Sequence, residues 1–474
     1  MGWSEGAKGN MKRREWITEC TYAEAPLNRR EFVGWAARVA ASLLLPRFVA
    51  DAESSSGCRR RPNIVLIVSD DQGYADISCY DHPEDVNTPN LDRLAKEGVR
   101  LTNGYASAPV CAPTRAGLIT GRYQQRFGFY TASDSRAGMP VTEITIARLL
   151  KQQGYVTGVI GKWHLGYEAP YQPLKRGFDE FYGFLGHGGH DYFDLKVRDP
   201  VTAIYRNDQP VNETGYLTQN FTREAVSFIE RHQREPFFLY LPYSAVHAPM
   251  QAPEEYLERF NTGDKKRDTY LAMLACMDDG IGDVLGALQR TGVDNNTLIV
   301  FLSDNGGALA RGANNGVLRA GKHSLHEGGI RVPFIARWPG QLPAGTVCSE
   351  PMICQDVFTT ILAAAGVKPP SDRIIDGRNV LPVLREEASR PLHDSLFWAW
   401  LKPNTNEEWA IRRGKWKLLS DRGGIELYDL EADVSETRDL AKQKPELVKE
   451  LTRIFEDWRG KMVPQIKRRR RKRS

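Results

Sequence analysis

Four short apolar runs, each followed closely by polar or charged residues, place the strongest constraint on how this chain folds. The runs are residues 64–68, 156–160, 237–241 and 298–302, and they are rich in β-branched and aromatic side chains. Such runs are typical of strands that are covered on both faces. Segments with helical spacing of apolar residues lie between them, at about 88–97, 142–153 and 267–289. This alternation predicts an α/β fold in which helices flank a large, mixed but mostly parallel sheet.

The polar residues that follow these runs are predicted to form one site. Ligands of such sheets bind beyond the carboxyl ends of the strands, and parallel strands end at the same edge. One polar pair alone would be read as a turn or a helix cap, but four runs that all end this way favour a shared site. In chain order the residues are Asp70 and Asp71, Lys162 and His164, His247, and Asp304 with Asn305.

Two kinds of chemistry are represented among these side chains. Asp70, Asp71, Asp304 and Asn305 offer only hard oxygen ligands, which favours Ca²⁺ or Mg²⁺ over zinc. During transfer of a sulfuryl or phosphoryl group, its negatively charged oxygens need positively charged protein groups beside them. The residues that can supply it are Lys162, Lys322, His164, His247 and Arg115.

Cys111 is the candidate nucleophile. It opens the segment Cys111-Ala112-Pro113-Thr114-Arg115, and Pro113 predicts a helix that runs to Thr120,. The amino terminus of a helix favours an anionic oxygen or sulfur beside it. A thiolate is one possibility, but its attack on a sulfate ester would leave a thiosulfate-type adduct with no easy exit.

These motifs resemble those of the formylglycine-dependent, type I sulfatases of the alkaline-phosphatase-like superfamily, with a pattern similar to aryl- and N-acetylgalactosamine-sulfatases. The resemblance covers residues 62 to about 458, and Thr114 stands where serine is commoner in the family. The segments that carry it include Cys111 to Arg115 with Thr120-Gly121-Arg122, Gly161-Lys162-Trp163-His164, His247-Ala248-Pro249, Ser303-Asp304-Asn305-Gly306-Gly307, Gly321-Lys322 and Glu327-Gly328-Gly329-Ile330-Arg331.

The resemblance implies roles for the candidate residues. Cys111 becomes formylglycine (3-oxoalanine) through a maturation enzyme, a transient partner, and its hydrate is the nucleophile. Ca²⁺, favoured over Mg²⁺, is held by Asp70, Asp71, Asp304 and Asn305. Arg115 stabilises the hydrated aldehyde, which is a geminal diol, and Lys162 and Lys322 bind the sulfate oxygens. His247 or Lys322 assists departure of the alcohol. His164 then takes the proton whose removal releases sulfate.

The implied reaction is hydrolysis of a sulfate monoester on a small molecule or, more specifically, a sulfated sugar or polysaccharide. In residues 186–191 the family implies a pocket wall, so His187, His190 and Asp191 are candidates for contacting the substrate; a glycine-rich surface loop is the alternative. Two other functions stay open, namely phosphate or phosphonate monoester hydrolysis on the same scaffold and non-catalytic binding of a sulfated glycan.

The chain divides into four predicted parts. Residues 1–52 resemble a twin-arginine export signal around Arg29 and Arg30, with an apolar run far too short to span a membrane,. Residues 62–390 are the predicted catalytic domain. Residues 391–462 are a predicted small α+β subdomain, with strands near 409–412, 416–419 and 426–430 and a helix at 445–458. Residues 463–474 are a basic tail. We therefore expect a bacterial periplasmic or secreted protein.

Charge and cysteine usage exclude other classes. The formal net charge of +5 comes from the ends, since residues 467–473 are all Lys or Arg, and the mildly acidic body indicates no nucleic-acid partner,. The tail is either disordered or binds an anionic surface. Seven scattered cysteines predict neither a disulfide framework nor a zinc site,. Cys348 could pair with Cys354 after export. A start at Met11, a lipid-anchored Cys58 and an ordinary disordered leader are alternatives at the amino terminus.

Overall fold

The computed structural model describes residues 61–81, 84–186, 188–388, 391–401, 407–421 and 423–466. The predicted export signal, Met11, Cys58, His187 and the basic residues 467–473 lie outside this range. The compact unit considered below begins at Arg59. No helix among the described residues combines the length and the apolar character that a membrane crossing requires.

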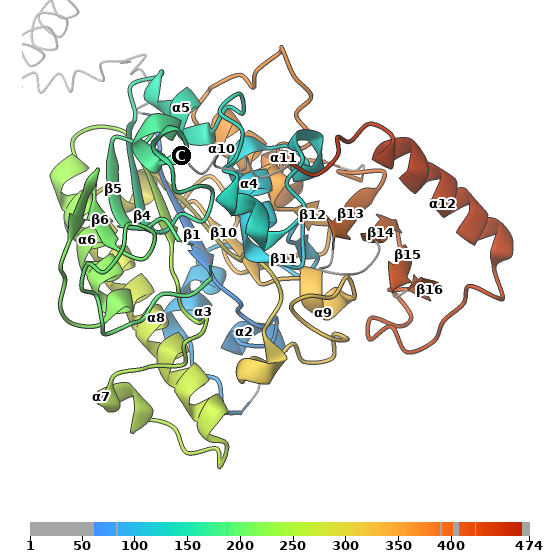
Figure 1. Cartoon of the computed structure of the whole chain (residues 1–474), viewed down its shortest axis with the longest axis horizontal. Helices are drawn as coiled ribbons and strands as arrows, with labels where there is room; N and C mark the ends of the chain where they lie inside the picture. Colours follow the sequence, from blue (N-terminus) through green and yellow to red (C-terminus); the bar gives the residue numbers. More distant parts are fainter. Residues whose placement is uncertain are drawn as a thin grey trace, which may run out of the picture. The chain divides into compact units, whose positions relative to one another are not determined.

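A ten-stranded mixed sheet forms the centre of this unit (Figure 1). Its four inner strands, β9, β1, β8 and β4, correspond to the four predicted runs, and they are neighbours in parallel register. Strands β10, β6 and β7 are antiparallel to their neighbours. In spatial order the strands are β11 (Thr346–Cys348), β2 (Val99–Leu101), β10 (Phe334–Arg337), β9 (Thr297–Ser303), β1 (Asn63–Ser69), β8 (Phe237–Pro242), β4 (Val156–Lys162), β5 (Glu180–Phe184), β6 (Ile204–Arg206) and β7 (Gln209–Val211).

Helices cover both faces of the sheet, which confirms the predicted α/β fold. Val65 and Ile67 of β1 pack in one apolar cluster with α3, α6 and α8, whereas Ile64, Leu66 and Val68 pack in another with α4, α5 and α10. The alternation follows from the two-residue period of a strand. The helices are α2 (Ser78–Asp81), α3 (Pro89–Lys96), α4 (Cys111–Thr120), α5 (Ile146–Lys151), α6 (Leu217–His232), α7 (Glu254–Leu257), α8 (Lys265–Arg290), α9 (Glu327–Ile330), α10 (Gln355–Ala364) and α11 (Leu381–Leu384).

Local capping explains two differences from the expected helices. Helix α5 begins only at Ile146, because the Thr145 side chain accepts the N–H of Arg148 and caps the helix there,. Thr88 occupies the N-cap position of α3, but its side chain makes no capping hydrogen bond to the helix. Instead Asp278 of α8 accepts the N–H groups of Asn90 and Leu91. A tertiary contact therefore replaces the local one.

A separate four-stranded antiparallel sheet follows in the order β13 (Leu396–Leu401), β14 (Glu407–Arg413), β15 (Trp416–Asp421) and β16 (Gly424–Asp429). Helix α12 (Pro445–Arg459) packs on it, and Trp409 stacks on Phe455 with ring centroids 4.3 Å apart. Strand β13 was not among the expected strands. A two-stranded ladder joins β3 (Gly104–Tyr105) and β12 (Met352–Ile353). The thiols of Cys348 and Cys354 are free, so the pairing considered for them is absent.

Candidate functional site

The strand-end carboxylates meet in one buried group, as the sequence predicts. Asp70 and Asp71 follow β1 and Asp304 and Asn305 follow β9, two strands in direct register. The backbone N–H of Asp71 donates to Asp304 Oδ1 at 3.3 Å, and Asn305 Nδ2 donates to Asp71 Oδ1 at 2.9 Å. All four side chains are at most 5% exposed. Three carboxyl groups in such a small volume require compensating charge.

Three cationic side chains supply that charge. Arg115, on α4, donates from Nε to Asp304 Oδ2 at 2.8 Å. Lys162, at the end of β4, forms an ion pair with Asp70, and Lys322 Nζ lies 2.6 Å from Asp71 Oδ1. Charges of opposite sign therefore balance within the group. We refer to these six charged residues as the strand-end cluster: Asp70, Asp71, Asp304, Arg115, Lys162 and Lys322.

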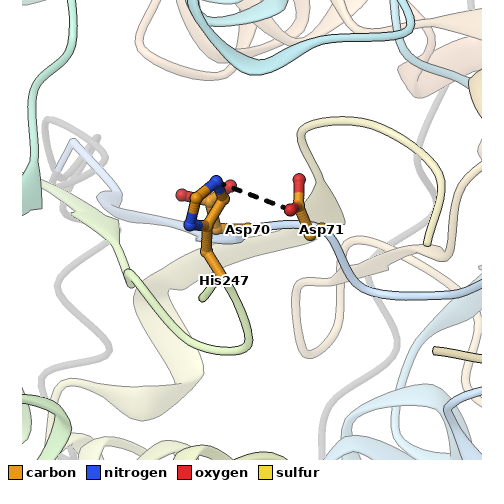
Figure 2. A group of neighbouring side chains, drawn as sticks. All are labelled: Asp70, Asp71 and His247. Carbon is orange, nitrogen blue, oxygen red and sulfur yellow. Dashed lines mark ion pairs between the residues drawn. The ribbon is translucent and has the colours of Figure 1, made fainter. Parts of the chain in front are cut away.

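His247 approaches the aspartates from a different loop, the one that follows β8. Figure 2 shows its imidazole beside Asp70 and Asp71, and the dashed line marks the 3.6 Å contact between Nε2 and Asp71 Oδ2. The other ring nitrogen, Nδ1, lies 2.7 Å from the carbonyl oxygen of Ala248. This contact fixes the ring so that Nε2 faces the cluster.

Cys111 is the first residue of α4, two positions before Pro113, so the helix begins earlier than expected. Proline fits there because the N–H groups of a first helical turn have no intrahelical acceptor. The Thr114 hydroxyl lies 3.1 Å from the carbonyl oxygen of Ala108, to which it donates. Threonine therefore performs a structural role at the position where serine was expected.

Two neighbouring cavities open onto this group. One, of about 330 Å³, is lined by Cys111, His164, His247 and Lys322 among others. The second, of about 480 Å³, shares His247 and Lys322 with the first and reaches Asp71. Cys111, Asp71 and three of the predicted cationic residues, His164, His247 and Lys322, thus line a space that a small anion could enter.

The predicted substrate-pocket residues are placed differently. His190 is buried, and its Nδ1 and Nε2 each lie 2.5 Å from a carbonyl oxygen, of Asp191 and Thr202 respectively. Asp191 accepts the N–H of Phe193 at 2.9 Å. Both side chains bond to backbone atoms near them, and neither residue lines either of the two cavities. The nearby Gly188 lines the cavity that contains Cys111.

Three further residues at this site were not predicted from the sequence. Arg136 and His323 line the cavity beside Cys111, and Asn315 bonds to the loops around it. The position of His323, directly after Lys322, is a signal that could have identified it. Arg136 and Asn315 lie in segments without a recognisable pattern, so only their tertiary contacts reveal them.

Burial raises the pKa values of the acidic groups at this site, and neighbouring charges either oppose or add to that effect. Burial raises the pKa of Asp71, but Lys322 and His247 hold it well below its ordinary value. Burial and then the neighbouring Asp70 raise the pKa of Asp304 to about 6. Burial also raises the pKa of the Cys111 thiol despite Lys162 and Lys322. The protonated thiol is therefore the form expected at neutral pH, which does not favour the thiolate alternative.

The donor set fits a hard divalent cation. Asp70 Oδ1 and Asn305 Oδ1 are buried and have no hydrogen-bond partner among the described residues, although buried polar atoms are normally paired. Asp70, Cys111 and Asp304 each offer an atom within 4.8 Å of the others, and so do Asp70, Asp71 and His247. A cation bound to these oxygens would satisfy both unpaired atoms.

Comparisons with known proteins agree with this geometry. Residues 62–367 match the family described as Sulfatase, and residues 320–461 match N-sulphoglucosamine sulphohydrolase, C-terminal. N-acetylgalactosamine-6-sulfatase of Homo sapiens is 40% identical over 405 residues, which cover 76% of this chain and 75% of that protein. Steryl-sulfatase of Mus musculus is 34% identical over 446 residues, covering 76% of this chain and 70% of that protein.

Solved structures give the same result. The crystal structure of Ps i-CgsB in complex with k-i-k-neocarrahexaose matches with a TM-score of 0.81 and 39% identity, covering 85% of this chain and 94% of that one. The chain therefore belongs to the sulfatase family, and it is a type I sulfatase of the alkaline-phosphatase-like superfamily.

Proposed function

We propose that this sulfatase hydrolyses sulfate monoesters of sugars, with a formylglycine derived from Cys111 as nucleophile and a divalent cation, calcium rather than magnesium, beside it. The observation that carries the proposal is the position of Cys111. It lies at the amino terminus of α4, next to the oxygen ligands and on the wall of a cavity lined by cationic side chains and by no carboxylate.

Asp70, Asp71, Asp304 and Asn305 would hold the cation through their side-chain oxygens. Once bound, it supplies a Lewis acid that stabilises negative charge on a nearby oxygen. Calcium is favoured because it accepts several carboxylates in one flexible coordination shell, whereas Mg²⁺ usually keeps several waters. The cluster's three carboxylates are matched by three cations, so a divalent ion gives the site a positive excess that an anionic sulfate ester can neutralise.

The modified Cys111 would supply a hydrated aldehyde, in which one hydroxyl attacks sulfur and the other permits release of sulfate. Arg115 reaches this position from one helical turn further along α4, while its own guanidinium is fixed by Asp304. Lys162 and Lys322 provide positive charge for the sulfate oxygens, because both ammonium groups already face the cluster,.

Proton transfer at the two ends of the reaction would involve different residues. His247 or Lys322 assists departure of the alcohol, and both line the two cavities through which the substrate would reach the cluster. His164 lines the cavity with Cys111 and is proposed to take the proton that allows sulfate to leave. Separate groups for the two steps suit a two-step transfer, since each step needs the opposite proton movement.

A sulfated saccharide is the proposed substrate class. N-acetylgalactosamine-6-sulfatase and a structure solved with a carrageenan-type hexaose are both about two-fifths identical to this chain. The steryl-sulfatase relative shows that the sulfatase scaffold also serves other alcohols, so the saccharide must be tested directly. For His187, His190 and Asp191 we retain contact with the sugar as a proposal. Export by the twin-arginine route and maturation by a dedicated enzyme also belong to the proposal.

The test combines mass spectrometry with matched substrates. The tryptic peptide that contains Cys111 should have the mass of the aldehyde after coexpression with a maturation enzyme. The same protein should release sulfate from N-acetylgalactosamine 6-sulfate or a sulfated carrageenan oligosaccharide, and Cys111→Ala should not. A peptide that remains a thiol would contradict the mechanism, and faster hydrolysis of the matched phosphate ester would support the phosphatase alternative. Binding of the saccharide without turnover would support the non-catalytic glycan binder.

A further inference from the structure

Asn315 is a buried residue that bonds to three backbone segments at the strand-end cluster, one of which lies in its own loop. Its Oδ1 accepts the backbone N–H of Tyr74 at 3.2 Å and that of Gly307 at 3.0 Å. Its Nδ2 donates to the carbonyl oxygen of Ala320 at 2.8 Å. With 2% of its surface exposed, the side chain is removed from substrate and solvent, so it acts through the loops that it joins.

Each of these loops carries part of the site. Tyr74 lies three residues after Asp71, and Gly307 lies two residues after Asn305. Ala320 lies two residues before Lys322, whose own N–H donates to the Gly307 carbonyl at 3.1 Å. A single amide thus connects both pairs of oxygen ligands with the segment that positions the lysine.

The geometry at this position is specific to an asparagine. The acceptor atom must face two N–H groups and the donor atom must face a carbonyl, so only one orientation of the amide satisfies all three contacts. The loops approach so closely that a Cβ on Gly307 would lie 2.9 Å from Asn315 Oδ1, and one on Gly321 would lie 2.9 Å from Nδ2. Glycine at both positions leaves room for the amide.

The joined loops also hold residues in a costly backbone conformation. Asp71, Ala320 and His323 have φ values of 63°, 61° and 70°, a region that residues other than glycine adopt only when surrounding contacts enforce it. Asp71 and His323 both line the cavities of the site. The hydrogen bonds of Asn315 are among the contacts that can keep these residues in place.

We propose that Asn315 is a positioning residue that sets the distance between the two pairs of cation ligands and aligns Lys322 with them. The inference rests on the proposed cation site, and it concerns residues that lie outside that site's ligand set. It predicts that loss of the amide weakens cation binding before any substrate is present, because the ligand pairs are no longer held in register. Residues that orient metal ligands typically change metal affinity by about 10- to 100-fold when mutated.

The neighbouring Asn314 offers a matched control. Among the residues that the structure describes, its Oδ1 accepts the N–H of Gly316 alone, at 2.8 Å and within the same loop, and the side chain is half-buried. Both residues are asparagines in one segment, and the backbone of Asn314 is itself held by Asp76 at 2.8 Å. Loss of a general loop contact would therefore affect both positions, whereas the proposed role belongs to Asn315 alone.

The experiment is a calorimetric titration of calcium into chelator-treated, desalted protein, together with thermal unfolding of each variant. Asn315→Ala should weaken calcium binding about 10- to 100-fold, and Asn314→Ala should stay within about twofold of the unaltered protein. Equal affinities for Asn315→Ala and the unaltered protein would overturn the inference, as would equal losses in both variants. If the unaltered protein binds neither calcium nor magnesium, the proposed cation site itself is wrong and this inference falls with it.

Asn315→Asp distinguishes the two hydrogen bonds that the amide accepts from the one that it donates. The variant also provides a test if Asn315→Ala does not fold. The carboxylate can still accept from Tyr74 and Gly307, but its second oxygen faces the Ala320 carbonyl and cannot donate. We expect a smaller loss of calcium affinity than in Asn315→Ala and a larger rise in KM for 4-nitrocatechol sulfate, since the Lys322 segment is released. A variant with unchanged KM and unchanged calcium affinity would contradict the role of the amide.

Discussion

Two groups of buried charged residues can be compared in the part of the protein that the structure describes. Their difference distinguishes a candidate catalytic group from a structural one. One is the strand-end cluster. The other, which we call the junction cluster, joins the main sheet region to the small antiparallel sheet. It consists of Glu327, Arg331, Arg412, Lys417 and Glu436. Both groups contain an ion pair between a lysine and a carboxylate whose side chains are fully buried, Lys162 with Asp70 and Lys417 with Glu327.

The difference lies in how completely the oxygens are paired. In the junction cluster, Glu327 accepts from Lys417 at 2.8 Å and from the Tyr105 hydroxyl at 2.6 Å. Glu436 Oε1 has no hydrogen bond among the described residues but lies 2.8 Å from the Lys417 ammonium nitrogen as an ion pair, and its Oε2 accepts the Glu327 N–H. In the strand-end cluster, Asp70 Oδ1 and Asn305 Oδ1 have no hydrogen-bond partner among the described residues, and cavities reach the group. Oxygens that face neither a hydrogen-bond donor nor a cation, in a group that a cavity reaches through Asp71 and Lys322, distinguish the candidate active site from buried charge alone.

The largest predicted effect is on stability, in the junction cluster. Lys417→Met should lower the free energy of unfolding by about 3–5 kcal/mol, because it leaves Glu327 and Glu436 without their shared cation in a buried place. Urea denaturation measures the loss. The kcat per folded molecule on an aryl sulfate should not change, and a variant that unfolds normally but has lost turnover would assign a catalytic role to this cluster.

The matched change in the strand-end cluster should affect rate instead. Lys322→Ala should reduce kcat/KM by about 10²- to 10³-fold, the usual effect of removing one group that stabilises transition-state charge. Its unfolding midpoint in saturating calcium should stay close to that of the unaltered protein, because the bound cation compensates Asp71. Steady-state kinetics and calorimetry check both parts. A large loss of stability with normal kcat/KM would reverse the roles given to the two clusters.

Removal of the cation should destabilise the protein through only one of the clusters. A ligand present at 100 times its Kd stabilises the folded state by about 2.7 kcal/mol, so chelation should lower the unfolding temperature by several degrees. Asp70→Asn should abolish most of this calcium-dependent shift, whereas Glu436→Gln should preserve it. Differential scanning calorimetry with and without chelator provides the measurement, and equal shifts in all three proteins would place the cation elsewhere.

The contrast also shows what could be predicted from the sequence. The inner strands were predictable because continuous apolar runs lead to Asp70, Lys162 and Asp304, and to His247 after a short connector. Parallel strands bring such residues to one edge of a sheet,. The junction cluster was not recognised as a group, because Glu327 and Lys417 are 90 positions apart and no shared sheet edge links them. Register between distant elements is a tertiary property.

Single contacts around the site could not be predicted from the sequence either. Asp278 caps α3 from another helix, although Thr88 occupies the N-cap position of α3 itself. The two ring nitrogens of His190 face backbone carbonyls, which a glycine-rich motif does not indicate. In each case the local pattern admits several partners, and the packing of elements that are remote in sequence decides among them.

The smallest predicted effect concerns pH and contrasts the two carboxylates of the junction cluster, Glu436 and Glu327. Burial and the nearby Glu327 outweigh the attraction of Lys417 and raise the pKa of Glu436 to about 7, from 4.5. The folded protein therefore binds this proton more tightly than the unfolded chain. The stabilisation is fully present below about pH 4.5 and is lost as pH rises through about 7.

For Glu327 the sign is opposite. Burial raises its pKa, but Lys417 and two arginines lower it to about 2, so its contribution is lost only as pH falls through that value. Between pH 5 and 8 the titration of Glu436 should therefore dominate within the junction cluster. It should lower the free energy of unfolding by on the order of 1–3 kcal/mol across that window.

Glu436→Gln tests this assignment, because the amide is neutral at every pH and can still accept the Glu327 N–H. Urea denaturation at pH 5.5 and pH 8 should show a smaller decrease of stability in the variant than in the unaltered protein. The comparison is best made in saturating calcium, where Asp304 and its neighbours are held by the cation and contribute little to the slope. Parallel pH profiles for the two proteins would contradict the assignment. They would mean that Glu436 is ionised across this pH range in the folded protein as well as in the unfolded chain.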